Sequence, residues 1–96
     1  MSLHAVIYRY ADDPAALDEH RPSHRDHLRK LYEAGQLVVS GPLAAGGGPG
    51  ALLIFRADSA EQVAQWLDND PFKVLGLIVE REIRVWNPAF GADRLA

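Results

Sequence analysis

Hydrophobic residues along the chain follow two different spacings, and these separate expected strands from expected helices. Near-continuous apolar runs rich in β-branched and aromatic residues predict strands at residues 3–10, 37–40, 51–55 and 77–86. Apolar residues instead repeat at helical spacing from about 22 to 34 and from 60 to 67. The chain therefore has the predicted order strand, helix, strand, strand, helix, strand.

Local signals place the ends of the helices. Pro22 fits the first turn of the first helix, where its missing N–H costs nothing, and Gly35 fits a left-handed C-cap. Ser59 and Gln62 match a capping box at the start of the second helix. Residues 68–71 end in proline and should stop that helix, because the residue before a proline avoids helical geometry.

This order of elements predicts a ferredoxin-like α+β fold. Each expected helix has one apolar face, so we expect a βαββαβ sandwich, a four-stranded antiparallel sheet with two helices on one face. The opposite face of the sheet would expose apolar side chains, which favours a homodimer joined sheet to sheet. The length of 96 residues predicts one domain, residues 1–96, of which 87–96 form a C-terminal tail.

The composition restricts the possible binding partners of the protein more than it restricts the fold. The net charge of −3 and the scattered basic residues argue against nucleic acid or an anionic membrane surface as a partner. The sequence contains no cysteine, which excludes disulfides, thiol catalysis and thiolate metal sites. No apolar run approaches the ~20 residues of a membrane span, and we expect a cytoplasmic protein.

One polar residue interrupts the apolar face of the first expected helix. His24, Leu28, Leu31 and Gly35 stand at i, i+4, i+7 and i+11, so they share one stripe that faces the core. A titratable imidazole thus occupies a position where a leucine would pack without complication. His24 is therefore the first candidate for chemistry.

Three short motifs occur together at spacings that are more specific in combination than singly. They are Arg21-Pro22-x-His24, Ser40-Gly41-Pro42 at a strand end, and Asp70-Pro71-Phe72. This combination resembles the YciI-related (YCII) family of the dimeric α+β barrel group. The resemblance implies a ferredoxin-like fold, a homodimer and an active site built on a histidine and an aspartate, which here are His24 and Asp70. The loop at 44–50 departs from the family pattern because it contains only Ala, Gly and Pro, so the resemblance names no substrate.

His24 and Asp70 admit a catalytic and a structural interpretation. The two helices of a βαββαβ sandwich run side by side, so the start of one can meet the end of the other. An aspartate that accepts a hydrogen bond from one ring nitrogen fixes the tautomer and leaves the other nitrogen free to exchange a proton. In the structural interpretation, Asp70 only caps the chain before Pro71, and His24 is a hydrogen-bonded core residue.

A row of histidines raises the separate possibility of a metal. His20, His24 and His27 stand at i, i+4 and i+7, a spacing that could hold zinc or another borderline metal. Pro22 lies between the first two, and no fourth ligand is evident nearby. A histidine-rich exposed edge is therefore favoured, and we expect neither a metal nor a cofactor.

Two further residues are candidates for contacting a substrate. Arg21, like Arg25, flanks the histidine near the expected helix N-terminus, a place that suits anions. Arg21 could bind a carboxylate or phenolate of the substrate, or it could pair with Asp18 or Glu19 on the surface. The surface pairing is favoured. Ser40 could bond a ligand or satisfy the backbone at the bend, and no Gly-x-Ser-x-Gly motif marks it as a nucleophile.

These observations predict a small cofactor-free enzyme that transfers protons on a small cyclic or aromatic organic acid. His24 would be the general acid or base, Asp70 would orient it, and Arg21 and Ser40 would contact the substrate. One histidine–carboxylate pair can catalyse isomerase and lyase reactions. The alternative is a non-catalytic dimer that binds a small ligand or a protein partner.

Overall fold

The computed structural model describes residues 1–44 and 46–95 and contains four strands and three α-helices in these parts of the chain. The strands are β1 (Ser2–Tyr10), β2 (Leu37–Pro42), β3 (Gly50–Ala57) and β4 (Ile78–Trp86). The helices are α1 (Pro14–Glu33), α2 (Ala60–Asp68) and α3 (Pro71–Val74), and a 3-10 turn follows at Ala92–Leu95. None of the described helices is both long and apolar enough to cross a membrane.

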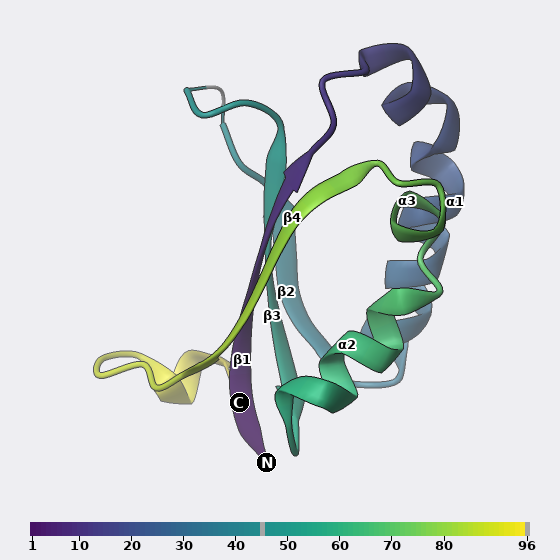
Figure 1. Ribbon diagram of the computed structural model, residues 1–96. Coiled ribbons are helices and arrows are strands. Elements are labelled where there is room, and N and C mark those ends of the chain that lie inside the picture. Colours follow the sequence, from purple (N-terminus) through teal and green to yellow (C-terminus); the bar gives the residue numbers. More distant parts are fainter. Residues whose placement is uncertain (45, 96) are drawn as a thin grey trace.

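The strands form one antiparallel sheet in the order β2-β3-β1-β4, and all three helices lie on one of its faces (Figure 1). The predicted ferredoxin-like βαββαβ sandwich is thereby confirmed. The strands β1 and β3 occupy the centre, which explains why their sequences are apolar on both faces.

The main core fills the space between the sheet and the helices. Val6, Phe55, Val63 and Leu67 have no exposed surface there. A second cluster joins Leu17 of α1 to two residues of the α3 region, Phe72 and Leu77. Tyr10 packs against both clusters, so the end of β1 lies where the sheet, α1 and α3 meet.

The prediction that Pro22 opens the first helix is wrong. Helix α1 begins at Pro14, about two turns earlier, and Pro22 lies inside it. The side chain of Asp13 caps the helix by accepting a hydrogen bond from the backbone N–H of Ala16 at 3.2 Å. Pro22 lies on the exposed side of the helix, where water can bond the carbonyl left free by its missing N–H. The proline at the first helical position is Pro14.

The other residues predicted to cap the helices agree with the structure more closely. Gly35 has a φ of +80°, and its N–H and that of Gln36 bond back to carbonyls of the last turn at 3.0 Å each, which forms a Schellman motif. The hydroxyl of Ser59 accepts from the N–H of Gln62 at 3.1 Å. The side chain of Gln62 reaches back to the N–H of Asp58 at 2.9 Å, one residue further than in the usual capping box.

The glycine-rich connection is shorter than predicted, because Gly50 belongs to β3 and is buried. A Cβ atom placed on Gly50 would lie 2.3 Å from the backbone oxygen of Tyr8, so only glycine allows the two strands to approach here. The strand β2 likewise continues through Pro42 instead of closing before it. Ala45, within the predicted connection, lies outside the described residues.

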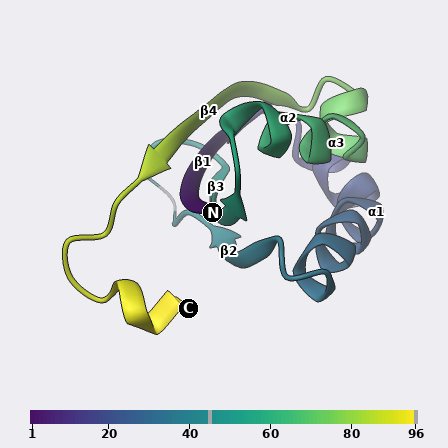
Figure 2. The same ribbon diagram turned by 90° about the horizontal axis from the view of Figure 1, so that it is seen from below.

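The sheet face opposite the helices carries exposed apolar side chains. Ile7, Val39 and Leu52 are 43%, 48% and 40% exposed, and the strand register places them on this face. The C-terminal segment also lies on this side (Figures 1 and 2), where Arg56 donates a hydrogen bond to the carbonyl of Leu95 at 2.5 Å. The sheet-to-sheet homodimer that this face suggests stays a prediction.

Candidate active site

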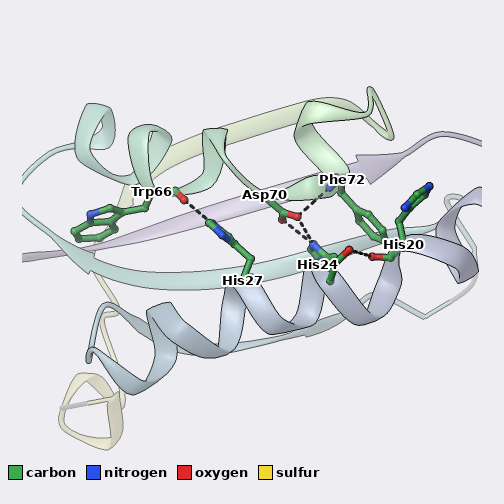
Figure 3. A network of polar contacts seen from close by, with 7 residues as sticks. His20, His24, His27, Trp66, Asp70 and Phe72 are labelled. Atoms are coloured by element: carbon green, nitrogen blue, oxygen red, sulfur yellow. Dashed lines mark hydrogen bonds and ion pairs between the residues drawn. The ribbon is translucent and has the colours of Figure 1, made fainter.

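The candidate site forms where helix α1 meets the junction of α2 and α3. His24, on the core-facing stripe of α1, is 6% exposed, and Asp70, between α2 and α3, is 0% exposed. Nδ1 of His24 lies 2.7 Å from Oδ2 and 2.9 Å from Oδ1 of Asp70 (Figure 3). The fold therefore brings together two side chains that are 46 residues apart in the sequence.

Asp70 also caps helix α3. Its Oδ1 accepts a hydrogen bond from the backbone N–H of Phe72 at 3.0 Å, and Pro71 occupies the first helical position. The capping role and the contact with the imidazole hold at the same time. The cap fixes the direction of the carboxylate, and the carboxylate in turn fixes the imidazole.

The carboxylate determines which ring nitrogen of His24 carries hydrogen. An ionised carboxylate only accepts, so Nδ1 is the donor and Nε2 is unprotonated in the neutral ring. Nε2 is then the ring nitrogen that is available to a bound molecule.

Two aromatic rings hold the imidazole in place. Phe72 stacks on His24 with ring centroids 4.0 Å apart and an interplanar angle of 4°. Tyr10 stands edge-on to the imidazole at 6.3 Å and to Phe72 at 5.3 Å. Neither Tyr10 nor Phe72 was predicted from the sequence as a site residue. The position of Phe72 directly after Asp70-Pro71 was the available signal, whereas nothing in the sequence distinguished Tyr10 from an ordinary strand residue.

His24 lines a cavity of about 620 Å³ between helix α1 and strand β2. Tyr10 and Phe72 line the same end, and Arg21 and Ser40 also contribute to the wall. Ser40 comes from the exposed part of β2. The cavity therefore brings together His24 and the two predicted substrate contacts, while Asp70 lies behind the imidazole and does not line the cavity.

Arg21 also makes the surface contact that was favoured from the sequence. Its Nη1 forms an ion pair with Oδ1 of Asp18, one turn earlier in α1. This pair leaves the side chain at the cavity wall.

The histidine row does not converge on one point. Nε2 of His27 donates to the backbone carbonyl of Trp66 at 2.8 Å (Figure 3), and Nδ1 of His24 is taken by Asp70. Nε2 of His20 lies 3.8 Å from Oε2 of Glu19. The described residues contain no cluster of three His, Cys, Asp or Glu side chains able to hold a metal.

Two tyrosines near the site remain protonated at neutral pH. Burial raises the pKa of Tyr10 to about 12, and the negative charge of Asp70 adds to this, while Arg21 and Arg25 act in the opposite direction. Burial also raises the pKa of Tyr8, and the negative charge of Asp70 adds to this. Tyr10 is therefore a neutral O–H group at the cavity wall.

The fold and the site define a small ferredoxin-like α+β protein in which a carboxylate-oriented histidine borders a ligand-sized cavity. The chain belongs to the family of the YCII-related domain, whose sequence model matches residues 2–87. The resemblance seen in the sequence motifs is thereby confirmed.

Individual relatives add information about chemistry. The chain is 34% identical over 77 residues to derivative of benzaldehyde biosynthesis cluster protein C of Emericella nidulans, covering 71% of this chain and 79% of that protein. It is 28% identical over 93 residues to Protein YciI of Escherichia coli, covering 84% and 95%. Among solved structures it is similar to 5-chloro-2-hydroxyhydroquinone dehydrochlorinase (TftG) from Burkholderia phenoliruptrix in complex with 2,5-dihydroxybenzoquinone. That similarity has a TM-score of 0.63 and 32% identity, and it covers 88% of this chain and 93% of TftG.

Proposed function

We propose that this protein is an enzyme that catalyses proton transfer on a small planar ring carrying hydroxyl or carboxylate groups, in an isomerisation or an elimination. One observation carries the proposal. The imidazole of His24 lines the cavity, and its Nδ1 forms a hydrogen bond with the buried carboxylate of Asp70. The similarity to TftG, a dehydrochlorinase crystallised with a dihydroxybenzoquinone, supports the substrate class.

In the proposed reaction, Nε2 of His24 accepts a proton from a ring carbon or hydroxyl. The electron pair of the broken bond forms a new C=C or C=O bond. In an elimination, a leaving group such as chloride departs with the electron pair of its bond to carbon, and the imidazolium then releases its proton to solvent. In an isomerisation, the imidazolium returns the proton to a different carbon. Asp70 keeps the ring in the productive tautomer, while Arg21 and Ser40 contact the substrate from the cavity wall.

The test follows proton transfer without assuming a product. Chlorinated and hydroxylated hydroquinones and substituted benzoates are incubated with the protein in D₂O, and deuterium incorporation and chloride release are measured. We expect one or more of these compounds to react with the wild type, and His24→Gln to lower the rate by about 100-fold or more. His20→Gln is the matched control, because His20 lies one turn away on the same helix and does not line the cavity.

Two outcomes would count against the proposal. Turnover by His24→Gln at the wild-type rate would exclude His24 as the acid or base. Tight binding of these rings by the wild type, with neither exchange nor release, would instead favour a ligand-binding protein.

A further inference from the structure

The cavity wall carries a charge opposite to that of the whole chain. Three arginines of α1, Arg21, Arg25 and Arg29, contribute to it together with His24. No Asp or Glu is among the described residues that line it, although the chain has a net charge of −3. Because the arginines are spaced four residues apart, they form one stripe along the helix. The cavity therefore favours an anion.

The three arginines differ in how far their charge is already neutralised. Arg21 pairs with Asp18, and Arg29 pairs with Asp26 at 3.2 Å. Arg25 forms no ion pair with any residue that the structure describes. A guanidinium without a carboxylate partner retains its donors for a bound anion. Arg25 lines the cavity as His24 does, and its positive charge acts on Tyr10, whose ring stands beside the imidazole.

The rest of the wall limits the shape of the anion. Opposite α1 the cavity is lined by residues of β2 and the segment after it, including Val38, Pro42 and Leu43. Leu28 and Leu53 add further apolar surface. One unpaired cation beside apolar walls suits a flat ring with a single charged oxygen better than a multiply charged, strongly hydrated group.

We propose that Arg25 binds an anionic oxygen of the substrate, a phenolate, enolate or carboxylate, while the ring lies against β2 and its reacting atom faces His24. This proposal rests on the proposed function of the cavity and adds to it the residue that selects the ionised substrate. When His24 removes a proton, the negative charge left on the ring spreads to this oxygen. Arg25 then stabilises the charge that develops during the reaction.

The probe for this proposal is 4-nitrophenol, whose absorbance distinguishes phenol from phenolate. We expect the wild type to bind the phenolate in preference to the neutral phenol. Arg25→Gln should weaken phenolate binding by roughly tenfold to a hundredfold, the loss typical of a charged hydrogen bond. Nitrobenzene, which has no charge, should bind equally to both proteins.

The matched control is Arg29→Gln, because Arg29 shares the stripe and the cavity wall but is already paired with Asp26. We expect it to change phenolate affinity less than threefold, as for a largely exposed charge that already has a carboxylate partner. Unfolding midpoints will show whether each variant is folded, and both positions are exposed on a helix.

Equal losses in the two variants, unchanged binding in Arg25→Gln, or no phenolate binding at millimolar concentration would each overturn the assignment. These results are separable from a failure of the proposed function. If His24→Gln reacts normally in D₂O while Arg25→Gln still loses phenolate, then Arg25 binds the anion but the histidine does not catalyse.

Discussion

Replacing Asp70 by asparagine should reverse the tautomer of His24 with little damage to the fold. The carboxylate accepts bonds from Nδ1 of His24 at 2.7 Å and from the N–H of Phe72 at 3.0 Å. The asparagine carbonyl can keep the bond to Phe72. Its NH₂ group would then replace Oδ2, the carboxylate oxygen nearer to Nδ1 at 2.7 Å. Because this NH₂ group can only donate, we expect Nδ1 to become the acceptor and the hydrogen to move to Nε2.

Two substitutions of Asp70 should lower the free energy of unfolding by different amounts. Asp70→Asn exchanges one charge-assisted hydrogen bond for a neutral one, which should lower the free energy of unfolding by about 1–2 kcal/mol. Asp70→Ala leaves two buried donors, Nδ1–H and the Phe72 N–H, without partners, at about 1–3 kcal/mol each. We therefore expect the alanine variant to lose about 2–6 kcal/mol. If the proposed function holds, Asp70→Asn should also slow turnover far more than its modest effect on stability would suggest.

The assay needs no substrate. Long-range ¹H–¹⁵N NMR spectra, recorded at a pH where the ring is neutral, report which nitrogen of His24 carries hydrogen. Urea unfolding measures the two stability losses. The reasoning is refuted if Asp70→Asn keeps hydrogen on Nδ1, or if asparagine destabilises the protein as much as alanine does.

Three further predictions concern the surroundings of the site. Gly50→Ala should lower the free energy of unfolding in urea by about 1–3 kcal/mol, because its Cβ would lie 2.3 Å from the backbone oxygen of Tyr8. Gly41→Ala is the control, since a Cβ there would have no atom within 4 Å. Equal losses in the two variants would contradict the close approach at Gly50. Between pH 10 and 12 the unfolded chain releases the Tyr10 proton while the folded chain keeps it, so stability falls as pH rises. The wild type should therefore lose about 2 kcal/mol more than Tyr10→Phe over this interval, and parallel unfolding curves for the two proteins would argue against the raised pKa. If the exposed sheet face forms a homodimer, Ile7→Asp should halve the mass measured by light scattering, and a monomeric wild type would exclude this interface.

The fold followed from the sequence because the signals for it are local. The apolar runs of the strands, the glycine cap at Gly35 and the serine cap at Ser59 each act within a few residues, and each was found where expected. The start of α1 was missed because two prolines, Pro14 and Pro22, both suit a first turn. The choice between them depends on the burial of Leu17 against Phe72, a contact between distant segments.

The candidate site could be predicted only in part, for the same reason. His24 stood out because a polar ring interrupted an apolar stripe, and the family motif supplied Asp70. The aromatic contacts of Tyr10 and Phe72 with the imidazole depend on how β1, α1 and α3 meet in space. The ion pairs that set Arg25 apart from Arg21 depend on the directions of long side chains, which spacing alone does not determine.

The position of β2 at the edge of the sheet divides the site into two parts that can change separately. The histidine and its supports come from α1, β1 and the segment around α3, where His24, Asp70 and Phe72 are all buried. The facing wall comes from an edge strand that pairs with β3 alone and ends in the glycine-rich connection. Substitutions at Val38, Ser40 or Leu43 can therefore reshape the wall without disturbing the His24–Asp70 pair. Directed evolution of the ligand preference of this protein would best begin with libraries confined to residues 38–43.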